Sequence, residues 1–411
     1  GGTVTVRYNG GVFRKKADQT FDALPRDTEP SNKLPNKPVG RVGMAVAPSN
    51  AQCLYVLMAS NGPDDFFGLY RSDDGGQTWS KRQLPGDSSR KLKQSNYNLT
   101  LAVHPTTPDT LIIGEKALWR STDGGNSWTC ISAPHGDSAG THSDQHVVVY
   151  DPAHADRVWL GNDGGIWLSQ DGGTTWLHRN RGLNTLQYYA MVHHASAESV
   201  LLAGAQDNGT QRFAGHAGWN LVGYGDGFFC GIDAQDPRYW YSSYCYRNAS
   251  GDLSGIKRSD VAGAITSWSN VTDGMDGAEY ASQGDEPFYV PFILDPVTSS
   301  TLYLGTTRLW RSHNRGTSWH AVAKLDGTVF TTATAVLPQK PTQHQGISAI
   351  CVDPNDPTII YVGARDGRIF QVVLKAFDAD GKVTDASWSA ATSPANPPAL
   401  DVVAPGDPGQ F

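Results

Sequence analysis

Three aspartates stand in short glycine-rich segments of the chain. Asp163 lies in GNDGG, Asp207 in AQDNG and Asp226 in YGDGF. Glycine beside an acidic residue is typical of tight turns, so Asp163 and Asp207 are each expected in the turn after a second strand, and Asp226 is expected at the start of the next inner strand. Carboxylates that converge from neighbouring turns can cleave a glycosidic bond, because one can donate a proton while the other activates water or attacks the sugar. We therefore predict that these three aspartates are catalytic. The alternatives are inert turns, axial hydrogen bonding or cation binding.

A second polar cluster precedes the first of these turns. His142, Asp144 and His146 form an H-x-D-x-H pattern at the start of an apolar segment. Because alternate residues of a strand point to one face, we expect the three side chains to share a face at the mouth of a channel. There they could bind substrate, hold a metal or move a proton. The alternative is a polar lining that hydrogen-bonds an adjoining strand.

Further residues near these segments could bind a sugar, since aromatic rings stack on sugar rings. The additional candidate substrate-binding residues are Tyr188, Tyr189, Tyr224 and Glu286. The hydrolysis itself requires no cofactor. Converging carboxylates also suit Ca²⁺, which takes oxygen ligands, so a structural Ca²⁺ ion is an alternative use of the same acids, although the sequence identifies no specific metal ligand.

A repeat indicates the elements that would position these residues. The octapeptide SDDGGQTW at 72–79 returns as STDGGNSW at 121–128 and SQDGGTTW at 169–176, and a degraded copy, SHNRGTSW, spans 312–319. The copies start 49, 48 and 143 residues apart, and the last interval is close to three times 48. A fixed period of this length predicts stacked sheet units that cannot bury a core alone. In each copy, Asp and Ser oxygens should accept backbone N–H groups in a tight turn, and Trp should pack between neighbouring units.

A second sequence pattern indicates the number of sheet units. Seven segments read as an apolar strand, a polar or proline-containing hinge and another apolar strand. An eighth unit is split between residues 1–25 and 399–411. Each unit also has an aromatic residue in its final strand. The seven segments begin at Val42, Leu99, His146, Tyr188, Phe228, Phe288 and Ile347, and the final-strand aromatics are Phe21, Trp79, Trp128, Trp176, Trp219, Trp268, Trp319 and Trp388.

These patterns predict an all-β fold. We expect one β-propeller domain over residues 1–411, with eight four-stranded blades. The C-terminal strand would pair into the N-terminal blade and close the ring, which hides sheet edges from aggregation. Seven blades is the alternative, if the chain ends pair differently.

The motifs also carry a family resemblance. The octapeptides resemble the Asp-box (BNR) repeats of sialidase-like and sortilin-like β-propellers, in which the box is a structural hairpin staple. The succession of motifs from Thr141 to Cys230, together with VGRVGMAVAPSN at 39–50, resembles a secreted, sortilin-like or glycosyl-hydrolase-like subset. The segment Asn162–Gly165 resembles the T-D-[IV]-G-G turn that carries a catalytic Asp in family 74 glycoside hydrolases. Those enzymes take their second Asp from a second propeller, whereas this chain is long enough for one.

The predicted function is a secreted, carbohydrate-active propeller, a glycoside hydrolase that uses aspartates at the channel mouth and acts on a polysaccharide or other glycan. The first alternative is a non-catalytic propeller that binds glycan or peptide, as sortilin-like domains do. The second is a polysaccharide lyase with Tyr188 or His146 as its base. A sialidase is disfavoured because the arginine triad is incomplete; Arg41 is the nearest candidate.

Composition limits the partners and the compartment. The net charge is −7 and the longest basic cluster is Arg14-Lys15-Lys16, which argues against nucleic acid. No apolar run reaches the roughly 18–20 residues of a membrane span. The chain begins without Met or a signal peptide, so we expect a mature or trimmed form. The family resemblance predicts a secreted, extracellular or periplasmic protein, and we expect a monomer.

The cysteines and the glycosylation sequons leave alternatives open. Cys230 and Cys245 are expected on neighbouring strands, where they either form a disulfide or remain buried free thiols. N-x-[ST] sequons occur at Asn98, Asn208, Asn248 and Asn270, and they matter only in a glycosylating secretory pathway.

Overall fold

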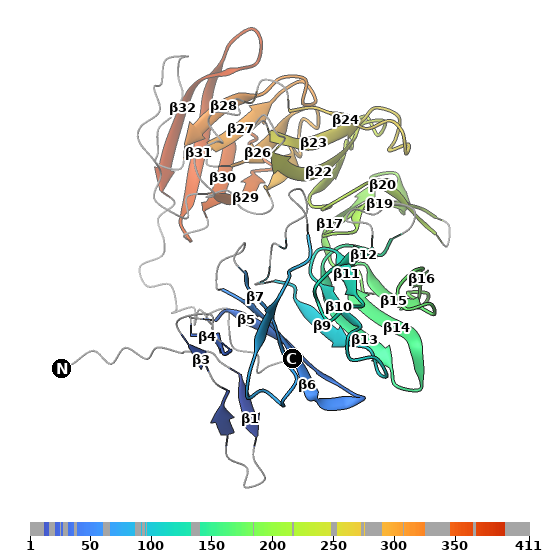
Figure 1. Ribbon diagram of the computed structural model, residues 1–411. Coiled ribbons are helices and arrows are strands. Elements are labelled where there is room, and N and C mark those ends of the chain that lie inside the picture. The colour runs from blue at the N-terminus through green and yellow to red at the C-terminus, as the bar shows by residue number, and fades with distance from the viewer. Residues whose placement is uncertain are drawn as a thin grey trace, which may run out of the picture. The chain divides into compact units, whose positions relative to one another are not determined.

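The computed structural model shows an all-β chain that divides into two compact units, Gly1–Thr185 and Leu186–Phe411 (Figure 1). Within the described residues, no helix is long and apolar enough to cross a membrane. The described residues are 12–15, 21–24, 26–27, 32–36, 39–60, 66–86, 92, 95, 97–132, 140–183, 185–215, 218–247, 253–272, 275, 290–306, 308–324, 346–364 and 367–390.

Three four-stranded antiparallel sheets dominate the first unit. Each sheet keeps its strands in chain order, so every connection is a hairpin. Two two-stranded pairs precede them: β1 with β2 is antiparallel and β3 with β4 is parallel. The strands are β1 (Phe13–Lys15), β2 (Phe21–Ala23), β3 (Arg26–Asp27), β4 (Leu34–Pro35), β5 (Arg41–Ala47), β6 (Asn50–Ala59), β7 (Phe66–Ser72), β8 (Ser80–Arg82), β9 (Thr100–Val103), β10 (Leu111–Gly114), β11 (Leu118–Ser121), β12 (Thr129–Cys130), β13 (Gln145–Asp151), β14 (His154–Asn162), β15 (Gly165–Ser169) and β16 (Leu177–His178).

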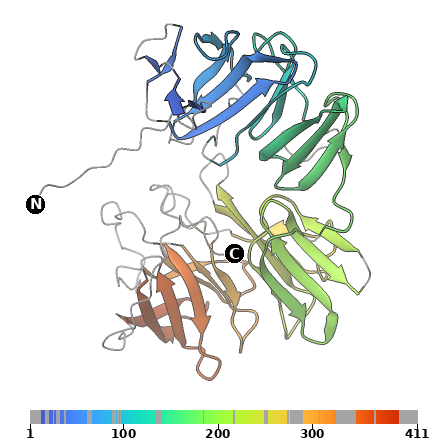
Figure 2. The same cartoon turned by 90° about the horizontal axis from the view of Figure 1, so that it is seen from below.

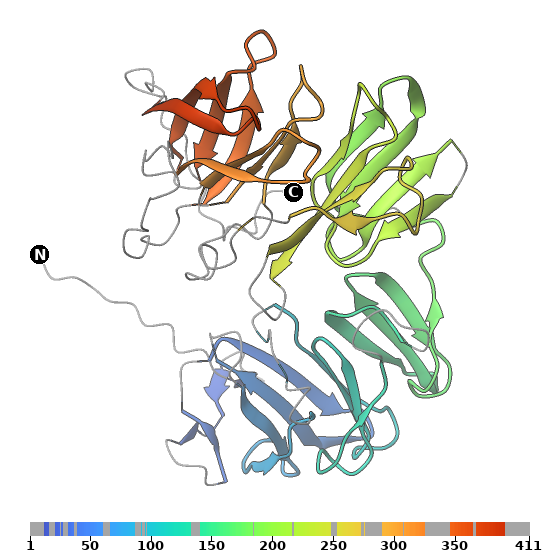
Figure 3. The ribbon, with the colours of Figure 1, turned by 90° about the horizontal axis from the view of Figure 1, so that it is seen from above.

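The second unit contains four sheets of the same kind, again in chain order. Figure 2 and Figure 3 show them from opposite sides as separate twisted sheets, coloured green to red. Their strands are β17 (Tyr188–His194), β18 (Ala197–Ala205), β19 (Gly209–Ala214), β20 (Trp219–Gly223), β21 (Cys230–Ile232), β22 (Trp240–Arg247), β23 (Leu253–Ser259), β24 (Ser269–Asn270), β25 (Phe292–Leu294), β26 (Leu302–Gly305), β27 (Arg308–Ser312), β28 (His320–Lys324), β29 (Ile347–Val352), β30 (Ile359–Ala364), β31 (Ile369–Phe377) and β32 (Val383–Ala390).

Every one of the seven predicted strand–hinge–strand segments forms the first two strands of a four-stranded sheet. The all-β prediction and the seven sheets are thus confirmed. The N-terminal part of the predicted eighth blade supplies the β1–β2 hairpin, which includes Phe21. Its other part, residues 399–411, lies outside the described residues. The eighth blade, the ring closure and the single domain therefore stay predictions.

Neighbouring sheets within a unit share their cores. In the first unit, Tyr55 and Leu57 of β6 pack with Leu101 of β9 and Ile113 of β10. In the second unit, a cluster that includes Leu309 of β27 and residues of β29 to β32 does the same. Cores shared between neighbouring sheets are what the period of the repeat predicts.

The octapeptide turns have the predicted internal bonding. Ser72 Oγ accepts the N–H of Gly76 at 2.7 Å, and the Asp74 carboxylate accepts the N–H and the hydroxyl of Thr78 at 2.9 and 2.6 Å. The copies at Asp123 and Asp171 repeat these bonds. The degraded copy uses the amide of an Asn in place of the carboxylate, since Asn314 Oδ1 accepts the N–H of Ser318. The turn is therefore built from local hydrogen bonds.

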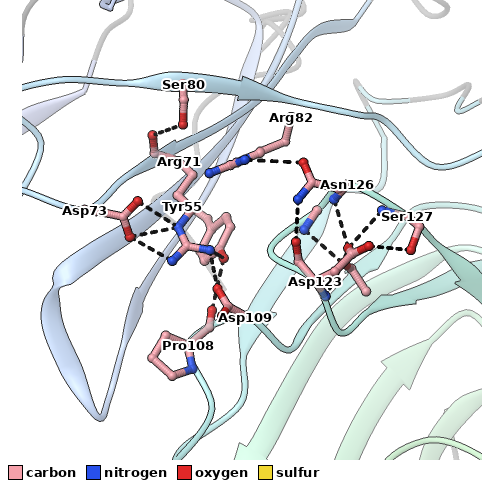
Figure 4. A network of polar contacts seen from close by, with 12 residues as sticks. Tyr55, Arg71, Asp73, Ser80, Arg82, Pro108, Asp109, Asp123, Asn126 and Ser127 are labelled. Carbon is pink, nitrogen blue, oxygen red and sulfur yellow. Dashed lines mark hydrogen bonds and ion pairs between the residues drawn. The ribbon is translucent and has the colours of Figure 1, made fainter.

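The same turns join neighbouring sheets. The indole N–H of Trp128 donates to Gln83 O of the preceding sheet at 3.0 Å, and Trp176 donates to Ile131 O at 3.1 Å. In the other direction, the Arg before each of several octapeptides reaches the following sheet: Arg71 binds Asp109 (Figure 4), and Arg120 donates to a carbonyl in the next octapeptide. The tryptophan role was predicted, whereas the arginine role was not.

A fifth turn of this kind escaped the sequence pattern. Ser259 Oγ accepts the N–H of Gly263 at 3.0 Å, as the first Ser of each octapeptide does. The segment then runs to Trp268 through two extra residues, which hide the motif from a fixed spacing. The preceding Arg258 donates to Arg315 O in the next sheet at 2.8 Å, so the arginine contact is also repeated.

These turns predict a specific acid sensitivity. The Thr78 hydroxyl holds the pKa of Asp74 well below its usual value, and partial burial of Asp171 is outweighed by the bonds from Thr175, which lower its pKa to about 2. Because these pKa values are lower than those of unfolded Asp, about 3.9, the stabilisation is complete above about pH 4 and is lost as pH falls towards 2. Replacing Asp74, Asp123 and Asp171 with Asn should flatten this part of the stability curve in acid denaturation.

The copy at Asn314 is the built-in control for this experiment, because it forms the same turn without a titrating group. An unchanged acid slope in the triple variant would show that other groups control acid unfolding.

Cys230 is a free thiol in the structure, which is the second of the two alternatives for this cysteine. Burial raises the pKa of this thiol well above its usual value, so it is unreactive at neutral pH.

Candidate functional site

Asp163 occupies the turn between β14 and β15, as predicted, and two side chains hold its carboxylate. The Nε2 atom of His146, from β13, lies 2.5 Å from Oδ1. The hydroxyl of Tyr97, from the segment before β9, donates to Oδ2 at 2.9 Å. The side chain of Asp163 is only 10% exposed. Both of its oxygens are therefore held in defined directions at a largely buried position.

Asp144 lies one residue before β13 in a left-handed backbone conformation, with φ of 65°. Two contacts fix it: its N–H donates to Lys116 O at 3.2 Å, and its Oδ1 accepts the amide N–H of Asn98 at 2.7 Å. Non-glycine residues adopt this conformation rarely, and Asp is among those that tolerate it best. The turn that carries Asp144 is therefore determined by contacts from the neighbouring sheet.

The two carboxylates form a pair. One oxygen of Asp144 lies within 4.8 Å of one oxygen of Asp163. Burial raises the pKa of Asp144, and the charge of Asp163 raises it further; Lys116 and the bond from Asn98 oppose the shift. Asp163 receives a hydroxyl donor and an imidazole contact, whereas Asp144 is pushed towards its protonated form. Two carboxylates in different surroundings are the arrangement that general acid and base catalysis uses.

The side-chain amides of Asn162 and Gln145 hold the segments that carry this pair. Asn162 Nδ2 donates to His142 O at 2.9 Å and its Oδ1 accepts the N–H of Gly164 at 3.1 Å. Gln145 Nε2 donates to His142 O at 2.7 Å. A Cβ at Gly164 would lie 2.4 Å from the Cβ of His142, so only glycine fits beside this ring. The network fixes the turn that presents Asp163.

The prediction that His142, Asp144 and His146 share one face of a strand is wrong. The strand begins at Gln145, so the first two residues precede it. Only His146 projects from the strand. His142 Nδ1 lies 3.1 Å from the carbonyl of its neighbour Ser143. Asp144 and His146 nevertheless both approach Asp163, because a left-handed turn replaces the expected alternation.

The other two predicted catalytic acids belong to the second unit. Asp207 lies in the turn between β18 and β19, as predicted, with φ of 57°. Asp226, which was expected to open the next inner strand, lies instead in the loop between β20 and β21, before β21 begins at Cys230. Asp226 Oδ1 accepts the N–H of Asp207 at 3.1 Å. This bond ties the loop to the turn, which is a structural role for one carboxylate oxygen. Convergence of these two acids with Asp163 stays a prediction.

Among the aromatic candidates, two have defined partners in the second unit. The hydroxyl of Tyr188 donates to Gln211 at 2.8 Å and its ring packs against Trp219, while the ring of Tyr189 packs edge-on against Phe228. Tyr224 is 81% exposed. Glu286 lies outside the described residues.

Sequence reasoning missed Tyr97 and Asn98. They precede β9 just as Asp144 precedes β13, so the equivalent position in the neighbouring sheet was the available signal. In the sequence, Asn98 stands out only as a glycosylation sequon. It is fully buried and bonded to Asp144, which removes it as a glycan acceptor in the folded chain.

The raised pKa of Asp144 has a consequence for stability. A carboxyl group with a higher pKa in the folded state than in the unfolded state destabilises the fold as pH rises through that interval. Asp144→Asn removes the charge and keeps an acceptor for Asn98, so we expect a higher melting temperature at neutral pH and no gain at pH 3. A lower melting temperature at pH 7 would contradict this explanation.

Comparisons with known proteins give distant matches. No known family profile matches the chain. It is 25% identical over 142 residues to a probable oligoxyloglucan-reducing end-specific xyloglucanase of Neosartorya fischeri, covering 34% of this chain and 17% of that protein. It is 27% identical over 195 residues to a xyloglucanase of Hypocrea jecorina, covering 41% and 23%. The chain thus spans less than a quarter of the length of the curated relatives it matches.

Solved structures give a similar picture. The GH74 xyloglucanase from Xanthomonas campestris matches with 18% identity and a TM-score of 0.32, covering 92% of this chain and 51% of that one. The GH74 enzyme of Niastella koreensis matches with 15% identity and a TM-score of 0.34, covering 93% and 69%. YCF48 from Cyanidioschyzon merolae matches with 13% identity and a TM-score of 0.29, covering 81% and 95%. Because these TM-scores are low, the fold assignment rests on the strand pairing described above.

Proposed function

We propose that this chain is a glycoside hydrolase of the Asp-box propeller type that cleaves a polysaccharide of the xyloglucan class. The observation that carries the proposal is the pair formed by Asp144 and Asp163, two carboxylates within 4.8 Å in different surroundings. The four octapeptide turns support the propeller assignment, and the xyloglucanase relatives support the substrate class. Secretion and a monomeric state belong to the same proposal.

In this proposal the two acids have different roles. Asp144, whose pKa is raised by burial and by Asp163, donates a proton to the leaving glycosidic oxygen. Asp163, whose carboxylate accepts the Tyr97 hydroxyl and contacts His146, activates water or attacks the anomeric carbon. If Asp163 attacks the sugar, a water then displaces it and gives its proton to Asp144. If Asp163 activates water, it takes that proton, and Asp144 is reprotonated from solvent as Asp163 releases it. Either way, water adds across the cleaved bond. Asp207 and Asp226 remain further candidates for the acid or for substrate contacts.

The direct test is the release of new reducing ends from xyloglucan by the purified chain. Because Asp144 must be protonated, the rate is expected to fall as pH rises above the pKa of Asp144. Absence of new ends, with binding retained, would favour the non-catalytic binding propeller.

A cation-binding scaffold is the second candidate, and one observation favours it. Asn98 Oδ1 is buried without a hydrogen-bond partner among the described residues, while the same amide contacts Asp144 through its nitrogen. An amide oxygen and two carboxylates are ligands that Ca²⁺ accepts. If the site holds Ca²⁺, the ion raises the melting temperature of the wild type and not that of Asn98→Ala.

A further inference from the structure

We infer that Tyr97 both fixes Asp163 and provides the surface on which a pyranose ring of the substrate stacks. The inference rests on the proposed function and adds a residue that determines substrate affinity. It is based on the observation that Tyr97 is held by three contacts and is still 47% exposed.

The anchors come from separate elements of the first unit. The hydroxyl of Tyr97 donates to Asp163 Oδ2 at 2.9 Å, in the turn after β14. The ring meets the imidazole of His146, on β13, edge-on, with centroids 5.0 Å apart and planes at 90°. The backbone carbonyl accepts a hydrogen bond from Nη1 of Arg41, at the start of β5. These contacts leave the ring few alternative orientations.

An anchored ring that stays exposed suits a ligand with an apolar face. An immobilised side chain loses little further conformational entropy on binding, so more of the stacking energy appears as affinity. Three of its contacts involve the hydroxyl, the ring and the backbone, and nearly half of the residue remains accessible. The C–H face of a sugar ring placed there would lie beside Asp163, which is where a reacting bond must be.

The experiment separates the ring from the hydroxyl. In an Asp163→Asn background, which removes turnover, xyloglucan affinity is measured by isothermal titration calorimetry. Tyr97→Phe and Tyr97→Trp keep a ring and should retain affinity within about twofold, whereas Tyr97→Ala should weaken it about tenfold, the size of one aromatic contact. With Asp163 intact, Tyr97→Phe should lower kcat and leave KM unchanged, because only the bond to the carboxylate is lost.

The matched control is Tyr361→Ala, which removes a tyrosine of β30 that is also partly exposed, at 37%. It should change neither affinity nor kcat. Equal affinity of Tyr97→Ala and Tyr97→Phe would overturn the stacking role, and so would an equal loss in Tyr361→Ala. If the chain binds xyloglucan through Tyr97 yet releases no products with Asp163 intact, the stacking surface stands and the hydrolase proposal fails. If it hydrolyses xyloglucan with an unchanged KM in Tyr97→Ala, the hydrolase proposal stands and this inference fails.

Discussion

Asp163→Asn is expected to lower the rate of polysaccharide hydrolysis at least about a thousandfold, the loss typical of removing a general base or nucleophile. The amide keeps the shape of the side chain and can still accept the Tyr97 hydroxyl bond, but it can neither take a proton from water nor attack a sugar. Initial rates of reducing-end release from xyloglucan, measured beside the melting temperature, check both activity and folding.

The same substitution at Asp156 is the control, because this residue lies on the same strand, β14, with an exposed side chain. It should leave the rate within about twofold. Asp144→Asn should lose activity to a similar degree as Asp163→Asn while raising the melting temperature. Full activity in either Asp144→Asn or Asp163→Asn, or an equal loss in Asp156→Asn, would show that this pair does not perform the chemistry. Loss in Asp207→Asn or Asp226→Asn instead would place the chemistry in the second unit.

Gly209→Ala is expected to cost about 2–5 kcal/mol of folding free energy in the second unit. A Cβ at this position would lie 2.0 Å from the carbonyl oxygen of Gly223, a backbone atom that cannot move aside easily, and the residue has φ of +71°. Left-handed backbone costs a non-glycine residue about 1–2 kcal/mol, and overpacking adds about 1–3 kcal/mol. Chemical denaturation of the variant and the wild type measures the difference.

Two other glycines separate these causes. Gly367 has φ of +85°, and an added Cβ would meet no described atom within 4 Å, so Gly367→Ala isolates the backbone strain. Gly218 has open space and no left-handed φ, so Gly218→Ala should be close to neutral. Equal destabilisation by Gly209→Ala and Gly367→Ala would mean that the close backbone approach contributes nothing.

The sheets could be predicted from the sequence because their signals are local. Each octapeptide closes its own turn: Ser72, Asp74 and Thr78 bond one another within seven residues. The alternation of apolar residues on either side of each hinge adds the two adjoining strands. A motif with a two-residue insertion, as at Ser259, was missed because the spacing changes while the bonds persist.

The site was predictable only in part, because its geometry depends on contacts between sheets. The turn that presents Asp163 was recognisable from its glycines. The pairing of Asp163 with Asp144 was not, since Asp144 takes its conformation from Lys116 and Asn98 of the neighbouring sheet. Tyr97 was missed for the same reason: nothing in its local sequence indicates that its hydroxyl reaches a turn 66 residues away.

The most direct test of the hydrolase proposal is digestion of xyloglucan by the purified chain in ¹⁸O-labelled water, followed by mass spectrometry of the products. Hydrolysis through Asp144 and Asp163 places one ¹⁸O at each new reducing end, and Asp163→Asn yields no labelled ends. An uncleaved polymer that remains bound to the wild type would identify a binding propeller and contradict the catalytic role of this pair.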